Sequence, residues 1–204
     1  SIPQSEHERT RHNLSQTTAF VGKKKDFFII TSSPGWTHAS PIIDGPAHEG
    51  RYHTVAHELF HVWQSNIGAY KKDPIAWMDE GIAHYIAALF LHDAKIYNYD
   101  AIRNGHVGEA GKVREPIHTL ESGTTFYKAG NPAIADEYSL AFLAVEFLTH
   151  DLPNSGIPAA ADYWKKMGQG STHQNAFEDA FGQSPVAFYQ RFEDYRKGGF
   201  KSKR

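Results

Sequence analysis

Apolar side chains recur at the three- to four-residue spacing of an α-helix through much of this chain. One stripe runs from Val55 to Trp63 and predicts a helix over residues 51–68. Asp73-Pro74 then provides a strong start for a second helix over residues 75–92, because the aspartate can cap the first turn and the proline ring already holds the helical φ. The same spacing predicts four more helices, at residues 136–149, 158–167, 172–181 and 185–197.

The remaining segments have other patterns. Residues 26–31 are a β-rich run that a Ser-Ser-Pro-Gly sequence ends, which predicts a strand. Residues 37–50 contain two prolines and two glycines and favour an extended loop or irregular strands, whereas the polar residues 3–18 favour a helix. Residues 104–130 carry five glycines and predict a long loop, with one short helix near residues 116–121.

These elements predict a single α+β domain that contains all 204 residues. We expect a small N-terminal sheet that covers the first strong helix, followed by a mainly helical C-terminal lobe. The domain would consist of an N-terminal helix and strands (residues 1–50), a helix pair (51–93) and a helical lobe (94–204). The sequence contains no internal repeat, low-complexity segment or linker that would divide it.

Composition is that of a globular protein and excludes several functions. The chain is 40% hydrophobic and 22% charged, and its formal net charge of −2 offers no excess of positive charge to a nucleic-acid backbone. The longest apolar run, Tyr85 to Leu91, is far shorter than the ~20 residues of a membrane span. There is no cysteine, which excludes disulfides and thiol nucleophiles; together with the non-Met first residue, this favours an exported protein, secreted or periplasmic.

The segment His57-Glu58-Leu59-Phe60-His61 is an H-E-x-x-H motif on the first predicted helix, a pattern typical of zinc proteases. Residues four apart on a helix differ by about 40° in azimuth and about 6 Å in rise, so both imidazoles lean toward one point. Glu58 lies at the edge of the same face, where it can contact a metal-bound water rather than the metal. The motif therefore predicts two metal ligands, His57 and His61, with Glu58 beside them.

The next helix offers a third ligand. Glu80 follows His61 after 18 intervening residues, within the string Trp77-Met78-Asp79-Glu80-Gly81-Ile82-Ala83. Its neighbours are largely apolar, so Glu80 is not on an obviously solvated face. Two histidines and one glutamate are a known ligand set of catalytic zinc, which keeps one position for water. We therefore predict that His57, His61 and Glu80 bind Zn²⁺.

The two motifs together, H-E-x-x-H and W-x-x-E-G-x-A, resemble those of the gluzincin metallopeptidases, in particular the aminopeptidase-N-like group and its shorter single-domain relatives. The string Tyr138-Ser139-Leu140-Ala141-Phe142-Leu143 is similar to the family's tyrosine at the head of an apolar helix. The resemblance covers roughly residues 27–197. It implies a thermolysin/aminopeptidase-like zincin fold of the peptidase MA kind and a peptide or protein substrate.

The resemblance also implies roles for individual residues. Glu58 would be the general base that takes the proton of a metal-activated water and passes it to the leaving amine. Tyr138 would donate a hydrogen bond to the tetrahedral oxyanion. Tyr127, His118 and His106 are alternative donors for that oxyanion.

Three neighbours of the motif residues need separate interpretations. His53 lies one turn before the motif, and its ring would be about 12 Å along the axis from His61, so we expect it near solvent at the start of the helix. His84, one turn after Glu80, either lines the cleft or packs in the core. Asp79 is a candidate for orienting a ligand imidazole.

The function that we expect is that of a zinc-dependent metallopeptidase. A zinc hydrolase of a non-peptide amide or ester, and a catalytically idle zinc-binding interaction domain, are the alternatives. The sequence leaves the substrate preference, the choice between exo- and endo-cleavage, and the oligomeric state open.

Overall fold

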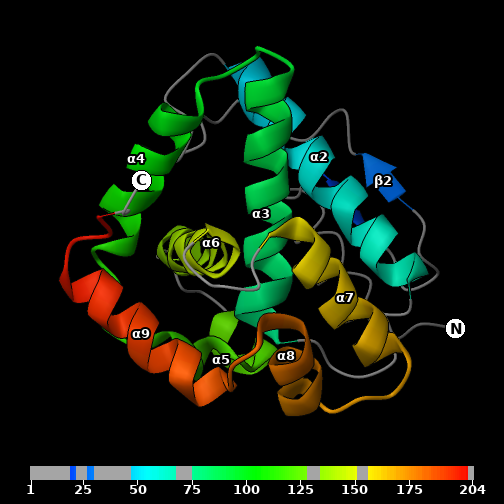
Figure 1. Ribbon diagram of the computed structural model, residues 1–204. Helices are drawn as coiled ribbons and strands as arrows, with labels where there is room; N and C mark the ends of the chain where they lie inside the picture. The colour runs from blue at the N-terminus through cyan, green and yellow to red at the C-terminus, as the bar shows by residue number, and fades with distance from the viewer. Residues whose placement is uncertain are drawn as a thin grey trace, which may run out of the picture.

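The computed structural model describes residues 19–21, 27–29, 47–67, 75–127, 134–150 and 156–201 (Figure 1). Two strands precede the helices, β1 (Ala19–Val21) and β2 (Phe27–Ile29). The helical elements, in chain order, are α2 (Ala47–Asn66), α3 (Ala76–Asp93), α4 (Tyr99–Ala110), the 3₁₀ helix η3 (Ile117–Leu120), α5 (Gly123–Phe126), α6 (Ile134–His150), α7 (Ile157–Gly168), α8 (His173–Phe181) and α9 (Pro185–Lys197).

The expected α+β class with an N-terminal sheet is wrong. In the described part of the chain, extended structure is limited to β1 and β2, which pair antiparallel with Ala19 opposite Ile29. Two strands of three residues cannot form a layer of their own, since isolated two-stranded hairpins are marginal in water. The described fold is helical, and α2 begins at Ala47, inside the segment expected to be loop or irregular strand.

Five of the predicted helices, now α3 and α6 to α9, are confirmed to within a few residues, as is the short helix near residues 116–121. Ser184 caps α9, because its hydroxyl oxygen accepts a hydrogen bond from the Ala187 amide at 3.2 Å. The helix predicted at residues 3–18 and the Asp73-Pro74 start signal lie outside the described residues.

Helix α4 occupies part of the segment that was expected to be a loop, where Gly105 and Gly108 lower the helix propensity. Packing against α6 outweighs that cost. Arg103 Nε lies 2.9 and 2.8 Å from the two carboxylate oxygens of Glu146, which is buried on α6. Asn98 also caps α4 by accepting a hydrogen bond from the Ala101 amide at 3.1 Å.

Helix α3 is central to the arrangement, with α2 on one side and α6, seen end-on in Figure 1, on the other. Gly81 allows α3 and α6 to approach closely, because a Cβ atom at this position would lie 2.4 Å from the Ala141 carbonyl oxygen. Trp77, buried one turn earlier, stacks on Phe188 of α9 with ring centroids 5.5 Å apart. The first turns of α3 are therefore fixed from two directions.

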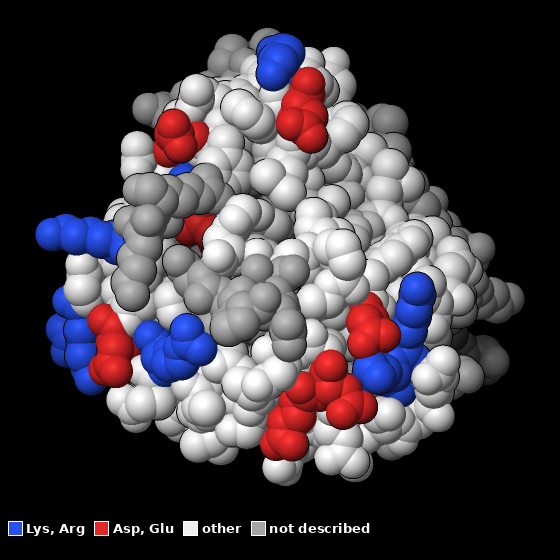
Figure 2. All heavy atoms as spheres, in the orientation of Figure 1, with Lys and Arg blue, Asp and Glu red and all other residues white. Residues whose placement is uncertain are grey.

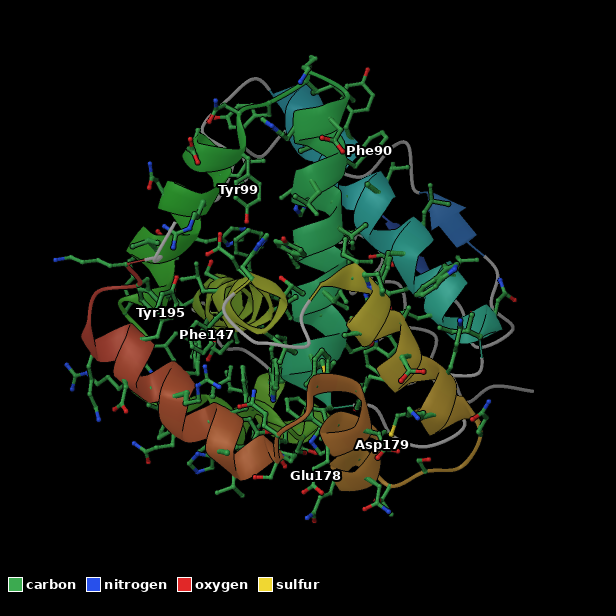
Figure 3. The ribbon with its side chains drawn as sticks, in the orientation of Figure 1. Phe90, Tyr99, Phe147, Glu178, Asp179 and Tyr195 are labelled. Carbon is green, nitrogen blue, oxygen red and sulfur yellow. The ribbon has the colours of Figure 1, made fainter. Side chains whose placement is uncertain are left out.

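A second aromatic contact attaches the C-terminal part of α9 to α6. Figure 3 shows Tyr195 of α9 beside Phe147 of α6, and their stacked rings are 4.7 Å apart. On the face seen in Figure 2, Lys and Arg side chains lie close to Asp and Glu side chains, without a continuous basic surface. None of the helices in the described ranges combines the length and apolar character that a membrane crossing requires.

Replacing Gly81 by alanine tests the close crossing of α3 and α6. We expect Gly81→Ala to lower the free energy of unfolding by about 1–3 kcal/mol, because the added methyl group meets backbone that cannot move aside. Gly108→Ala is the matched control, since nothing lies within 4 Å of that Cβ position and alanine at this exposed site should stabilise the helix by roughly 0.5–1 kcal/mol. Urea denaturation measures both, and equal stabilities of the two variants would contradict the crossing.

Candidate metal centre

The three predicted ligands come together from two helices. His57 and His61 lie one turn apart on the face of α2 that packs against α3, and Glu80 lies in the second turn of α3. All three side chains are buried, although two of them are basic and one is acidic. In the described residues they are the group of His and acidic side chains whose ligand atoms converge closely enough to hold a metal ion, within 4.8 Å of one another.

The distances between these atoms match those of a metal site. The Nε2 atoms of His57 and His61 are 3.0 Å apart, and they lie 3.2 and 3.5 Å from Glu80 Oε2. Ligand atoms that bind zinc tetrahedrally at 2.0–2.1 Å are about 3.3 Å from one another. The three atoms therefore form one face of a tetrahedron of the size that zinc requires.

The buried charge of Glu80 needs compensation, because a carboxylate with 8% of its surface exposed is costly unless it is paired or binds a metal. Burial raises the pKa of Glu80, but the two imidazoles outweigh burial and hold that pKa well below its usual range. Burial lowers the pKa of His61, but Glu80, Asp79 and Glu58 outweigh it and raise that pKa to about 10. Burial lowers the pKa of His57. The negative charge of the Glu80 carboxylate is therefore compensated either by a proton on the imidazole pair or by a metal ion.

The outer nitrogen of His61 has an orienting partner that the sequence did not reveal. His61 Nδ1 is 2.8 Å from Gln64 Oε1, whereas Asp79 Oδ1 is 3.9 Å away. Gln64 is fully buried one turn after His61, so the amide oxygen fixes the imidazole with Nε2 toward Glu80. The i, i+3 spacing of these two residues on α2 was the available signal. Asp79, the expected partner, is the more distant of the two.

The second oxygen of Glu80 contacts Tyr127. The Tyr127 hydroxyl donates a hydrogen bond to Glu80 Oε1, so that Oε2 alone faces the imidazoles. Burial raises the pKa of Tyr127, and the nearby carboxylate raises it further, so the phenol remains a donor. Tyr127 was expected only as an alternative oxyanion donor.

Tyr138 and Glu58 both lie within electrostatic range of the ligands. Burial raises the pKa of Tyr138, and the negative charges of Glu80 and Glu58 add to the effect. The Tyr138 ring packs 5.0 Å from the ring of Phe126 and 4.9 Å from that of His84. Glu58 is half-buried on α2, next to His57 in the chain.

Of the other histidines weighed in the sequence, His53 and His106 are buried and His118 is exposed. His53 is 7% exposed, so its expected position near solvent is wrong; its ring packs 4.9 Å from His84, which in turn lies 4.5 Å from His57. His84 therefore belongs to the wall of the metal centre. His106 is fully buried, with Nδ1 3.1 Å from Ser139 Oγ, which excludes it as a donor to a substrate. His118 is exposed and lines a different cleft beside α9.

A cleft of about 600 Å³ lies beside the ligands, between the start of α3 and α5. Its lining includes Asp79 and Tyr127, which contact His61 and Glu80, together with Glu121, Ser122 and Thr124. Its volume is that of a typical ligand pocket, and its lining is about equally polar and apolar.

Comparison with known proteins gives no match for this chain, whether with protein-family models, with curated proteins or with solved structures. The interpretation of the centre therefore depends on the geometry described above and on the sequence motifs.

Metal binding is directly measurable. We expect the protein to bind one Zn²⁺ per chain. We expect His61→Ala and Glu80→Gln to weaken Zn²⁺ binding by more than 10- to 100-fold, the typical cost of losing a residue that only orients a ligand. His92→Ala is the control, because His92 is exposed about 18 Å along α3 from Glu80. Competition with a chromogenic chelator gives the affinities, and circular dichroism verifies the helix content. Unchanged affinity in either ligand variant would contradict the site.

Proposed function

We propose that this protein is a zinc-dependent metallopeptidase with a gluzincin-like ligand set. The observation that carries the proposal is the convergence of His57 and His61, from an H-E-x-x-H helix, with Glu80 of the next helix. Within the described residues this group has three ligands, the number that catalytic zinc sites use, whereas structural sites use four. The count favours a catalytic centre over an idle zinc-binding domain.

The donor atoms also fit zinc better than calcium or magnesium. Two imidazole nitrogens and one carboxylate oxygen suit zinc, whereas calcium and magnesium prefer sites made of oxygen atoms. When bound, zinc lowers the pKa of a coordinated water toward neutrality and polarises a carbonyl group. The other steps of hydrolysis belong to side chains of the chain itself.

Glu58 is the general base of the proposed mechanism. It follows a ligand directly in the sequence and is half-buried, so its carboxylate can reach the water that attacks the scissile carbonyl without itself binding the metal. It takes a proton from that water as the new carbon–oxygen bond forms. It then delivers the proton to the leaving amine as the carbon–nitrogen bond breaks.

Tyr138 is the donor to the oxyanion that develops on the carbonyl oxygen. The described residues offer its hydroxyl no hydrogen-bond partner, whereas the hydroxyl of Tyr127 is already donated to Glu80. Burial raises the pKa of Tyr138 and keeps the phenol protonated. Its ring is held between Phe126 and His84, which limits its motion and prepares the hydroxyl for the transition state.

The cleft beside the ligands supplies room for a peptide. It opens next to Asp79 and Tyr127 and is large enough for several non-hydrogen atoms of a substrate side chain and backbone. The polar part of its lining suits the backbone of an extended chain, which carries one hydrogen-bond donor and one acceptor per residue.

Digestion of a mixed peptide library, read by mass spectrometry, tests the function. We expect cleavage that a chelator abolishes and zinc restores, and a Glu58→Gln variant that loses about 10²- to 10⁴-fold in kcat because the general base is gone. Zinc content of this variant should be unchanged. Hydrolysis of amide or ester compounds without cleavage of any peptide would instead indicate a non-peptide hydrolase. Zinc binding without turnover of either class would indicate an idle domain.

The proposed oxyanion donor has its own test. Tyr138→Phe should lower kcat about 10²- to 10³-fold, equivalent to roughly 2.7–4 kcal/mol, with little change in KM, because the hydrogen bond forms only in the transition state. Steady-state kinetics on a single cleaved peptide measures the change. The assignment of Tyr138 is wrong if this variant retains the wild-type kcat.

A further inference from the structure

The carboxylate of Glu80 is held asymmetrically. Its Oε2 atom faces the two imidazole nitrogens, at 3.2 and 3.5 Å, while its Oε1 atom accepts the hydrogen bond from the Tyr127 hydroxyl. A carboxylate can bind a metal through one oxygen or through both. The phenol occupies the oxygen that would be needed for the second mode.

We propose that Tyr127 is a positioning residue that keeps Glu80 a one-oxygen ligand and so holds the metal centre four-coordinate, an inference that rests on the proposed metallopeptidase function. With Oε1 engaged by the phenol, two nitrogens and one oxygen would be left to hold a metal ion, and a fourth position would stay available to water or substrate. Without the hydroxyl, Oε1 would be a buried carboxylate oxygen that has lost its donor, which favours its turning toward the metal.

Tyr127 ends a short segment, residues 121–127, that is hydrogen-bonded to the helix that carries Glu80. The Ala76 amide at the start of α3 donates to the Glu121 carbonyl at 2.9 Å, which ties the α5 segment to α3 one turn before Glu80. The Tyr127 amide donates to the Gly123 carbonyl at 2.8 Å. Phe126 is fully buried and packs against the Tyr127 ring at 5.1 Å. The position of the phenol is therefore set by these hydrogen bonds and by packing on Phe126.

Tyr127 and Tyr138 both pack on Phe126 but differ in their hydrogen bonds. The Phe126 ring contacts Tyr127 on one side and Tyr138 on the other, at 5.1 and 5.0 Å between centroids. Only Tyr127 donates to a ligand carboxylate. For Tyr127 to stabilise a substrate oxyanion it would have to break that bond, so the geometry favours a role in the resting centre for Tyr127 and leaves the transition-state role to Tyr138.

Substituting Tyr127 by phenylalanine tests this inference on the full chain, without a substrate. We expect Tyr127→Phe to bind Zn²⁺ about 10- to 100-fold more weakly in competition with a chelator. The reason is that Glu80 would lose the hydrogen bond that orients its carboxylate. In the Co²⁺-substituted protein we expect the visible absorption to weaken, because five-coordinate Co²⁺ absorbs less strongly than tetrahedral Co²⁺. Because Tyr127 is 43% exposed, removing its hydroxyl opens no buried cavity.

Tyr138→Phe is the matched control, since it removes the other phenol without touching Glu80. It should retain the wild-type Zn²⁺ affinity and Co²⁺ spectrum. If Tyr127→Phe also retains both, the inference is overturned while the proposed function stands, and a loss of kcat alone would make Tyr127 the oxyanion donor. A wild-type protein that binds neither ion overturns the proposed function and this inference together.

Discussion

The centre of this protein depends on one electrostatic constraint, the burial of the Glu80 carboxylate against two imidazoles. A carboxylate at this depth is stable only when positive charge meets it, and the facing nitrogens of His57 and His61 provide that charge through a proton or through a metal ion. The same three atoms form a triangle of the size that a tetrahedral zinc ion requires. The fold therefore maintains at this point an arrangement that favours a cation.

Helix α3 carries Glu80 and is held in place by contacts with α6 and α9. Its crossing with α6 is close because Gly81 has no side chain, and its first turn is held by the stack of Trp77 on Phe188. Glu80 lies between these two anchors in the sequence. The first two turns of α3 are thus held by contacts on both sides of Glu80 in the sequence, which suits a residue that must keep an oxygen close to its partners.

The two residues that hydrogen-bond the predicted ligands differ in their sequence separation from them. Gln64 is three residues from His61 on the same helix, so helical geometry alone brings it to Nδ1. Tyr127 is 47 residues from Glu80 and reaches it only because the α5 segment is bonded to the start of α3. Partners of the second kind have no local sequence signal, which explains why Tyr127 was expected in a different role.

The sequence by itself predicted five of the helices and the two histidines that face one point, because helical periodicity and the i, i+4 spacing are local properties. It also predicted Glu80 beside them, from its place on the next helix. It misjudged α4, where contacts with α6 outweigh two glycines. It also predicted a sheet large enough to cover the first helix, whereas extended structure in the described residues is limited to one pair of three-residue strands, because a β-rich run of six residues specifies no partner. It also misjudged His53, whose burial depends on His84. Only the tertiary structure decided which oxygen of Glu80 faces the imidazoles and which phenol holds the other, since both depend on contacts between helices that the chain brings together only when it folds.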